Sequence, residues 1–517
     1  MAKAAFISLY DQSAYGIRLL SACLKKEGHK RHIIFFKGYN SGTNRSDVAL
    51  YDGEIPWEGI GNCGNSFVYA IGRDISYKEK EILIDLLKNI KPDFIGLTVN
   101  TPLKWRAILV SKLIKKHFPD TLLIWGGFEP TINPKDSLQY CDIACIGEAE
   151  DTIVELANAI DKNKDIKKIR NLCFNDNGSL LKNGINPPRK DLDTLPFQDC
   201  SSEGNFFIES DQLQKSPKFL FPVPKIYSTI AARGCMFKCT YCCELYLQDL
   251  YHPHTFLRRR SPENVIEELK EVKSNHDINH IIFQDEVIAY QMDWLKIFSP
   301  LYKKSIGLTF TSYVFPTKNF EERIKVLKDA GLSYTCLAVQ SGSKSISKLY
   351  KRPYNKQLYL EAARILRSMD IGFYTDVIAY NPLEKKDDLE STLDVLLEIP
   401  QPYDLCINKL YVLPGTKLYE QLADYEIDKN KFAMFSYYSA LFQISSYFKN
   451  AKILIRVIKS VYIFSRYPAL LKPILYITSL LGSLNTSIYF LMKRKRSGEL
   501  NISFVRNVIK RKLRLSW

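Results

Sequence analysis

The chain has 517 residues, of which 46% are hydrophobic and 25% charged, an ordinary composition for a globular protein of about two to four domains. Its 12 cysteines are scattered apart from one central cluster, which argues against a disulfide framework and fits a reducing cytosol. The net charge is +16, but residues 430–517 hold 16 Lys and Arg against the single acid Glu499 and so carry +15. This basic tail requires an anionic partner.

The first 160 residues alternate short apolar runs with helical patterns, and the opening run predicts a strand rather than a signal peptide. Short buried strands separated by helices predict a parallel, doubly wound sheet of the flavodoxin or Rossmann type. Ligand crevices in such sheets form at the carboxyl ends of strands, where Gly126, Gly127, Gly147 and Glu148 stand. Tight turns explain such glycines equally well. For Glu148 the alternative role is to stabilise the N-terminus of the following helix with its negative charge. The expected strands are Ala4–Tyr10, Ile33–Phe36, Asp93–Val99, Leu122–Trp125 and Ile143–Ile146.

Residues 161–225 carry turn and breaker signals such as Asn175-Asp176-Asn177-Gly178, and we expect them to form a connector. From residue 226 to 424, strand and helix signals alternate again. Six such units predict a partial (β/α)6 barrel with its chemistry at the carboxyl ends of the strands. The expected strands are Ile226–Ala232, His280–Gln284, Leu308–Tyr313, Tyr334–Gln340, Gly372–Ile378 and Leu405–Tyr411, and the expected helices include Pro262–His276, Phe320–Ala330, Lys356–Met369 and Lys386–Glu398.

Three cysteines follow the first barrel strand with the spacing C-x3-C-x2-C: Cys235, Cys239 and Cys242. A structural zinc site normally closes with four ligands, whereas three cysteines on a [4Fe–4S] cluster leave one iron open for a cofactor or substrate. The cluster is therefore preferred over a zinc or structural site. Cys243 is expected to be a spectator whose side chain points away from Cys242.

Residues 425–517 are expected to form a basic, helical C-terminal region. Lys449, Lys452, Arg456 and Lys459 stand three or four residues apart among large aliphatics, which predicts an amphipathic helix with a basic stripe. The 20 uncharged residues 473–492 could span ~30 Å as a helix, but seven of them are Ser, Thr, Asn or Gly. Interfacial membrane binding is favoured over a true span or a docked soluble helix. Nucleic-acid binding ranks lower, because the basic residues alternate with aliphatics rather than with polar residues.

Beyond these patterns, the chain resembles a known family over about residues 3–425. The cysteine run, with the aromatic Tyr241 before its third cysteine, is similar to the signature of radical S-adenosylmethionine (SAM) enzymes. The segments Gly126–Thr131 and Gly147–Glu150 resemble the cobalamin-binding domain that many of these enzymes carry. The resemblance implies a radical SAM enzyme with a [4Fe–4S] cluster, SAM and cobalamin as cofactors.

The resemblance also implies site residues. Cys235, Cys239 and Cys242 would bind three irons, and SAM would chelate the fourth and be cleaved to a 5′-deoxyadenosyl radical; no catalytic residue is assigned beyond this cluster. Many relatives have Glu where Gln340 stands, and Gln adds hydrogen bonds but no charge. No histidine lies in an Asp-x-His-x-x-Gly context, so the lower axial position of cobalamin is not expected to be a protein histidine. The implied SAM residues are Tyr241, Gln284, Asp285, Glu286, Gln340 and Ser341. For Asp285 and Glu286, capping of the next helix is the alternative. The implied cobalamin residues are Gly126, Gly127, Gly147 and Glu148.

Methylation of an unactivated carbon in a lipid-like or membrane-presented substrate is the expected reaction. The alternatives are cyclisation, rearrangement or C–C coupling without net methylation, and a non-enzymatic Fe–S sensor or scaffold at a membrane. The expected partners are a small-molecule or lipid substrate, a reducing electron donor and an anionic membrane surface. The expected location is the cytoplasm, with peripheral attachment at the inner face of the membrane.

Overall fold

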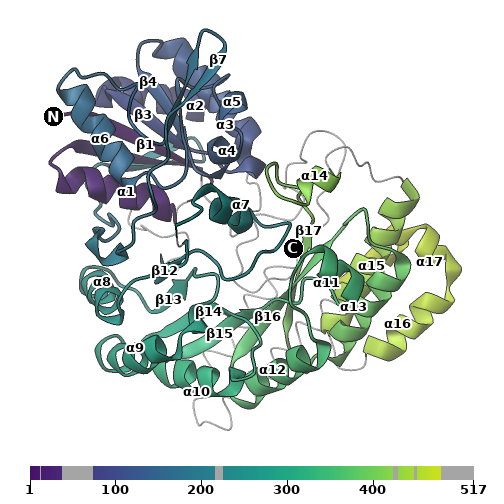
Figure 1. The fold of residues 1–517 in the computed structure, drawn as a ribbon. Coiled ribbons are helices and arrows are strands. Elements are labelled where there is room, and N and C mark those ends of the chain that lie inside the picture. Colours follow the sequence, from purple (N-terminus) through teal and green to yellow (C-terminus); the bar gives the residue numbers. More distant parts are fainter. Residues whose placement is uncertain are drawn as a thin grey trace.

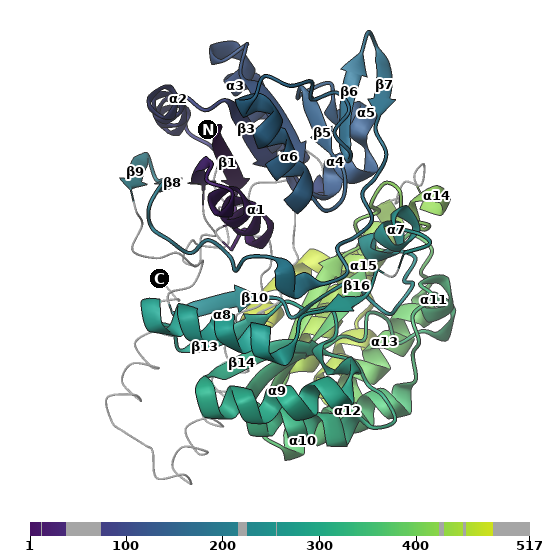
Figure 2. The same cartoon turned by 60° about the vertical axis from the view of Figure 1, so that its left-hand side comes forward.

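Two large sheets organise the chain, one in each lobe of the molecule (Figure 1). The computed structural model describes residues 1–11, 13–37, 74–215, 225–254, 256–422, 429–447 and 451–478. The first sheet has nine strands, the second has six that are all parallel, and a third, two-stranded antiparallel sheet is separate from both. Figure 2 shows the lobe of the first sheet above the lobe of the second. The predicted α/β fold class is confirmed.

The first sheet has the order β7-β6-β5-β4-β3-β1-β2-β8-β9, and β5-β4-β3-β1-β2 is its parallel core. This is the flavodoxin-like order, in which ligands bind where the order reverses between β1 and β3. Its strands are β1 Lys3–Leu9, β2 Lys30–Phe36, β3 Phe94–Thr98, β4 Leu122–Gly126, β5 Ile143–Cys145, β6 Leu172–Asp176, β7 Ser179–Lys182, β8 Asn205–Glu209 and β9 Gln212–Lys215.

Helices cover both faces of this sheet. Residues of α1 and α6 pack with one set of strand side chains and residues of α2 and α3 with the other, which explains why the core strands read as continuous apolar runs. The elements are α1 Tyr15–Lys26, α2 Tyr77–Ile90, α3 Lys104–His117, α4 Phe128–Ile132, α5 Pro134–Ser137, α6 Glu150–Asp161 and the 3₁₀ turns Thr101–Leu103 and Leu192–Thr194.

The expected connector 161–225 is not simply a connector. Its antiparallel hairpins β6–β7 and β8–β9 extend the two edges of the first sheet. Sequence patterns missed them because β7 and β9 are four-residue strands that are mostly exposed and therefore carry no apolar run. The turn signal itself was correct, since Asn177 and Gly178 both have positive φ at the tip of the first hairpin. The boundaries at 160, 225 and 424 stay a prediction.

The second sheet is the partial barrel, in the order β10-β13-β14-β15-β16-β17. An aromatic cluster joins it to α9: Phe283 contacts Phe298 and Phe310 at ring-centroid distances of 5.7 and 5.5 Å. Burying each such side chain contributes ~2 kcal/mol. The elements are β10 Ile226–Thr229, β11 Ala232–Arg233, β12 Arg258–Arg259, β13 His280–Phe283, β14 Thr309–Val314, β15 Leu332–Leu337, β16 Gly372–Ala379, β17 Asp404–Lys409, α7 Cys243–Leu250, α8 Pro262–Asn275, α9 Met292–Ser305, α10 Phe320–Ala330, α11 Lys344–Leu349, α12 Lys356–Ser368, α13 Lys386–Glu398, α14 Tyr419–Leu422 and the 3₁₀ turn Ile288–Tyr290.

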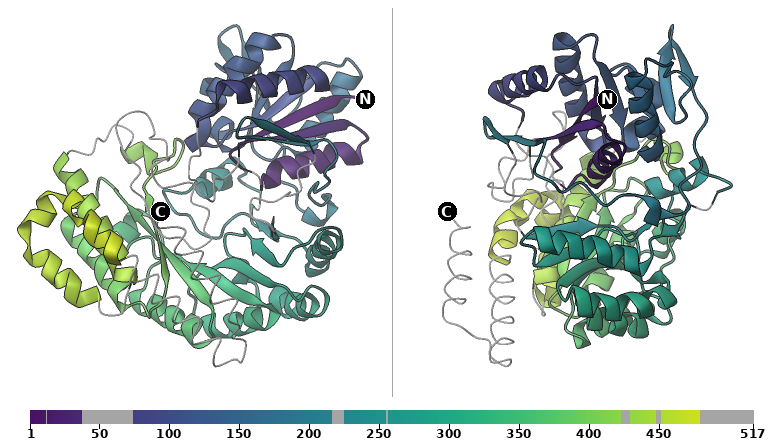
Figure 3. Two further views of the ribbon diagram at one scale, coloured as in Figure 1. Left: turned by 180° about the vertical axis from the view of Figure 1, so that it is seen from behind. Right: turned by 90° about the vertical axis from the view of Figure 1, so that its left-hand side faces the viewer.

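Helices at the outer edge of the barrel form the described part of the C-terminal region (Figure 3). Helix α15 packs on α13, and α16 packs on α15 through Ala451, Ile455 and Ile458. No helix in the described part of the chain is long and apolar enough to cross a membrane. Residues 479–492 of the uncharged stretch 473–492 lie outside the described residues. These helices are α15 Lys429–Tyr447, α16 Ala451–Ser460, α17 Tyr462–Arg466 and the 3₁₀ turn Pro468–Leu471.

Candidate functional site

The three cysteines of the C-x3-C-x2-C run lie on the loop between β11 and α7. The Gln248 side chain of α7 donates hydrogen bonds of 2.9 Å to the carbonyls of Cys235 and Phe237. On the other side, the backbone N–H of Thr240 donates to the carbonyl of Tyr350 at 3.0 Å. These contacts hold the loop between α7 and the segment that follows α11.

The donor set of this loop fits a three-thiolate cluster. All three cysteines are free thiols, and Arg352 places a guanidinium nitrogen 4.0 Å from Cys239 Sγ, where it can offset thiolate charge. Within the described ranges, no three His, Cys, Asp or Glu side chains converge on a single metal ion. A [4Fe–4S] cluster does not require that convergence, because each cysteine binds a different iron. Burial raises the pKa of Cys235 to about 12, so loading the cluster must release protons.

Contrary to the prediction, the side chain of Cys243 does not point away from Cys242, whereas its role as a spectator stays a prediction. Its thiol lies within hydrogen-bonding reach of Cys242, and this contact, followed by burial, raises the pKa of Cys242. The reason is the backbone: Cys242 is the extended N-cap of α7 and Cys243 its first helical residue, so the two side chains do not alternate as they would along a strand.

Five of the six residues predicted to bind SAM follow the strands β13 and β15, and Tyr241 lies in the cysteine loop. Gln284 and Glu286 follow β13 and line the cavity described below. Gln340 follows β15 with a positive φ of 61°, and its side-chain oxygen is buried without a hydrogen-bond partner among the described residues. A buried unpaired acceptor is costly, and a bound donor such as a ribose hydroxyl would satisfy it. Gln340 thus fits a ligand.

The other predicted SAM residues are engaged within the protein. Both carboxylate oxygens of Asp285 accept from the backbone N–H of Ala231, at 2.9 and 3.1 Å, and burial raises the pKa of Asp285 to about 6. Ser341 is 1% exposed and accepts from the backbone N–H of Ser343. Tyr241 packs edge-on against Tyr350 with ring centroids 4.8 Å apart. Their assignment to SAM stays a prediction.

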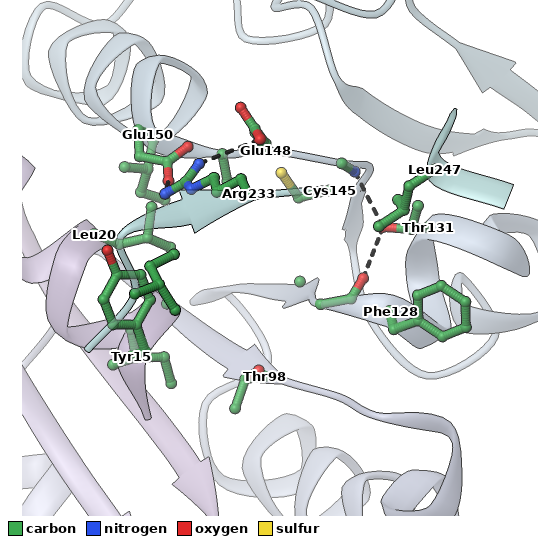
Figure 4. A pocket seen from close by; sticks show the side chains of 18 of the residues that line it. Tyr15, Leu20, Thr98, Phe128, Thr131, Cys145, Glu148, Glu150, Arg233 and Leu247 are labelled. Carbon is green, nitrogen blue, oxygen red and sulfur yellow. Dashed lines mark hydrogen bonds and ion pairs between the residues drawn. The ribbon is translucent and has the colours of Figure 1, made fainter. Parts of the chain in front are cut away.

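A cavity of about 450 Å³ separates the first sheet from the barrel. Its upper wall is the carboxyl edge of β3, β4 and β5 with the start of α1, and its lower wall includes Arg233, Gly234, Leu247, Gln284 and Glu286. Figure 4 shows Tyr15 and Leu20 of α1 on one side of this cavity and Phe128 with Leu247 on the other. Ligands of doubly wound sheets bind at this edge.

The glycines predicted for cobalamin all line this cavity. A Cβ on Gly126 would meet no atom within 4 Å, so its absence leaves open space in the wall. Gly127 and Gly147 have φ of 102° and 71°, and a Cβ on either would press on Val99 or Tyr251. Thr131 fixes this wall, since its hydroxyl donates to the Gly127 carbonyl at 2.7 Å and accepts from the Gly147 N–H at 3.0 Å (Figure 4). The wall therefore fits a large ligand pressed against its backbone.

Glu148 has a different role from the glycines. Its carboxylate accepts two hydrogen bonds from Arg258, at 2.5 and 3.0 Å, and lies 3.3 Å from Arg233, which also pairs with Glu150 at 2.5 Å. Burial alone would raise the pKa of Glu148, but the two arginines hold it below its usual value. This ion-pair cluster fastens the first domain to the ribbon β11–β12. Sequence reasoning missed Arg233 and Arg258, although the run Arg258-Arg259-Arg260 was a visible signal.

We expect Glu148→Gln to lower the free energy of unfolding by about 3 kcal/mol, because it leaves the Arg258 guanidinium, which is 4% exposed, without its counter-charge. Urea unfolding followed by tryptophan fluorescence measures this. Asp329→Asn is the matched control: it breaks the exposed pair with Lys303 and should cost less than about 1 kcal/mol. Equal costs for the two variants would contradict the interface role.

Family models match both α/β parts of the chain. The B12 binding domain model matches residues 7–157, and the Radical SAM superfamily model matches residues 229–396. The chain therefore carries a B12-binding domain followed by a radical SAM domain. Its cofactors are a [4Fe–4S] cluster, SAM and cobalamin, as predicted, and the non-enzymatic alternative is not supported.

Two similar proteins are named for different reactions. An uncharacterized methyltransferase of Pyrococcus horikoshii is 23% identical over 68% of this chain and 73% of its own length. The anaerobic magnesium-protoporphyrin IX monomethyl ester cyclase of Cereibacter sphaeroides is 25% identical over 67% of this chain, which spans only 56% of that relative.

Two solved structures share the fold. The radical SAM methyltransferase TsrM of Kitasatospora setae, with cobalamin and a [4Fe–4S] cluster bound, has a TM-score of 0.59 and 14% identity over 83% of this chain and 80% of its own. The cobalamin-dependent enzyme OxsB, with aqua-cobalamin and SAM bound, has a TM-score of 0.58 and 15% identity over 99% of this chain and 83% of its own.

Proposed function

We propose that the protein methylates an unactivated carbon of a lipid-like substrate. The observation that carries the proposal is the single cavity whose upper wall is the predicted cobalamin edge and whose lower wall adjoins the cysteine loop. When bound, the cofactors supply a methyl group and a substrate radical. The proximity of the two sites favours transfer within one enclosed space. A relative named as a methyltransferase supports this reaction.

The residues of the site have three tasks in this proposal. Apolar side chains such as Ile17, Leu20 and Leu247 exclude water, which protects a reactive radical. Gln284 and Glu286, at the end of β13, offer acceptors for the amino group of SAM. Gln340, which is not among the residues that line the cavity, offers its unpaired side-chain oxygen to the ribose of SAM.

Cyclisation or another rearrangement without net methylation is the second candidate, because a relative is named as a cyclase. The test uses SAM labelled with a deuterated methyl group, full-length reduced enzyme and a bacterial lipid extract, followed by mass spectrometry. A product that gains one labelled methyl group is expected. Formation of 5′-deoxyadenosine with a changed product that carries no label would favour the second candidate.

The C-terminal region supports the proposed lipid substrate and membrane partner. In residues 451–478 the large side chains Ile453, Val457, Tyr462, Tyr467 and Tyr476 are 54–75% exposed, and the segment contains five basic residues and no acid. Exposed aromatics and aliphatics among basic residues are typical of a surface that binds the interface of an anionic bilayer. Inner-face attachment stays part of this proposal.

We expect the full chain to float with vesicles that contain anionic lipid at low salt, and a chain truncated after residue 429 to stay in the soluble fraction. The affinity comes from burial of the exposed apolar side chains in the bilayer interface. Attraction of each basic residue to the anionic membrane surface adds ~1 kcal/mol. Vesicle flotation measures the distribution, with neutral vesicles as the control. A full chain that does not float would contradict the membrane proposal and leave the chemistry untouched.

A further inference from the structure

The strands β14 to β17 carry a set of polar and aromatic side chains that faces the interior of the barrel. Successive side chains of a strand point to opposite faces. On β16, Phe373 and Val377 belong to the core that the outer helices share, whereas Tyr374 belongs to a separate cluster. Asp376, two residues after Tyr374, shares its face. The neighbouring strands contribute Tyr313, Tyr334, Cys336 and Cys406 to this cluster.

Asp376 has no close countercharge on this interior face. The Cys336 thiol and the Asn408 amide each donate to one of its carboxylate oxygens, at 3.4 Å in both cases. Both donors are neutral, and both bonds are long. The charge of Arg352 acts on Asp376 only over a distance, because the Arg352 guanidinium is bonded to the carbonyl of Ala338. No Lys or Arg in the described ranges forms an ion pair with Asp376.

The carboxylate of Asp376 can take a further partner. Asp376, Asn408, Tyr313 and Tyr334 are all partly exposed although they face the barrel interior. Burial raises the pKa of Asp376, because a carboxylate without a countercharge is disfavoured away from bulk water. Two weak neutral donors leave lone pairs on both oxygens, and a charged donor would make the stronger bond.

Asp376 is also next to the predicted SAM site. The backbone N–H of Gln340 donates to the carbonyl of Asp376 at 2.7 Å, and the N–H of Ile378 donates to the carbonyl of Gln340 at 2.8 Å. Gln340, which offers its unpaired side-chain oxygen to SAM in the proposed function, is thus fastened to β16 on either side of Val377. A group bound at Asp376 would lie beside this end of the SAM site.

We propose that Asp376 positions the substrate through an ion pair with a protonated amine, so that the lipid-like substrate is an amphiphile with a basic headgroup. This inference rests on the proposed function. An ammonium group has three donors and can bond to both carboxylate oxygens. Asp404 on β17, which accepts from the Tyr334 hydroxyl, adds a second negative charge to this face. An anionic headgroup would be repelled by both carboxylates.

The aromatic side chains of the interior face favour the same class of ligand. Tyr334 and Tyr374 stack with their ring centroids 6.0 Å apart, and Tyr313 packs against the same cluster. The faces of such rings attract a cation, and the attraction grows where water is excluded. A carboxylate bordered by tyrosine rings therefore suits an ammonium group better than a neutral hydroxyl.

The test uses the full chain reconstituted with its cofactors, without reductant, and three probes of equal chain length: octylamine, octanol and octanoate. Calorimetry measures each Kd. We expect octylamine to bind about 10-fold or more tightly than octanol or octanoate. In Asp376→Asn, which keeps the shape of the side chain, the preference for octylamine over octanol should fall to less than about 3-fold. The control Asp329→Asn removes an exposed charge on α10 and should keep the full preference.

Equal Kd values for octylamine and octanol in the unaltered chain would overturn the proposal, and this comparison needs no folded variant. An undiminished preference in Asp376→Asn would also overturn it, as would a labelled product of the lipid-extract assay that carries no amine. Failure of the proposed function gives a different result: no lipid gains a labelled methyl group, while octylamine still binds through Asp376.

Discussion

Replacing Cys239 by alanine is expected to abolish 5′-deoxyadenosine formation, with a loss of ~10³-fold or more relative to the unaltered chain. Cys239 is the most buried of the three cysteines and the one that Arg352 contacts. Without its thiolate, one iron of the cluster has no protein ligand. Iron content after anaerobic reconstitution and the yield of 5′-deoxyadenosine measure the effect together.

Cys336→Ala is the control for Cys239→Ala. Cys336 is also a buried thiol, but it lies on β15, where its thiol donates to Asp376 at 3.4 Å. Iron content should be retained in this variant. A Cys239→Ala protein that still binds a full cluster and cleaves SAM would contradict the assignment of the cysteine loop.

Gly126→Val is expected to weaken cobalamin binding by about 10- to 100-fold, which corresponds to the usual cost of overfilling a packed site, while the protein stays folded. Gly126 ends β4 and lines the interdomain cavity, and a Cβ there would meet no protein atom within 4 Å. The added side chain therefore occupies space that the proposal gives to the corrinoid. Equilibrium dialysis with hydroxocobalamin measures the loss.

Gly147→Ala provides the contrast to Gly126→Val. Gly147 has a φ of 71°, and a Cβ there would collide with the Tyr251 hydroxyl, so this variant should lose stability as well as cobalamin. Circular dichroism melts separate the two cases. If Gly126→Val binds cobalamin as tightly as the unaltered chain, the corrinoid does not lie against β4.

The sequence was sufficient for the elements with strong local signals. All five strands of the first sheet's core and all six barrel strands appear within a few residues of their predicted positions, because each is a short segment rich in apolar, aromatic or β-branched residues. Phe320–Ala330 and Lys386–Glu398 were predicted to the residue. In both helices, acidic residues in the first turn mark the N-terminus, and apolar residues with a period of 3.6 mark the buried face.

The contacts between the two domains could not be predicted from local sequence patterns. The pairing of Glu148 with Arg258 joins residues 110 apart, and no local pattern specifies such a contact. The ribbon β11–β12 has two residues in each strand, too few for any periodicity.

Anaerobic reconstitution of the full chain with iron, sulfide, cobalamin, SAM and reductant is the decisive measurement for a cobalamin-dependent radical SAM enzyme. We expect about four irons and one corrinoid per chain, with 5′-deoxyadenosine formed only in the presence of reductant. A chain that binds neither iron nor corrinoid, or that binds both and leaves SAM intact, would contradict it.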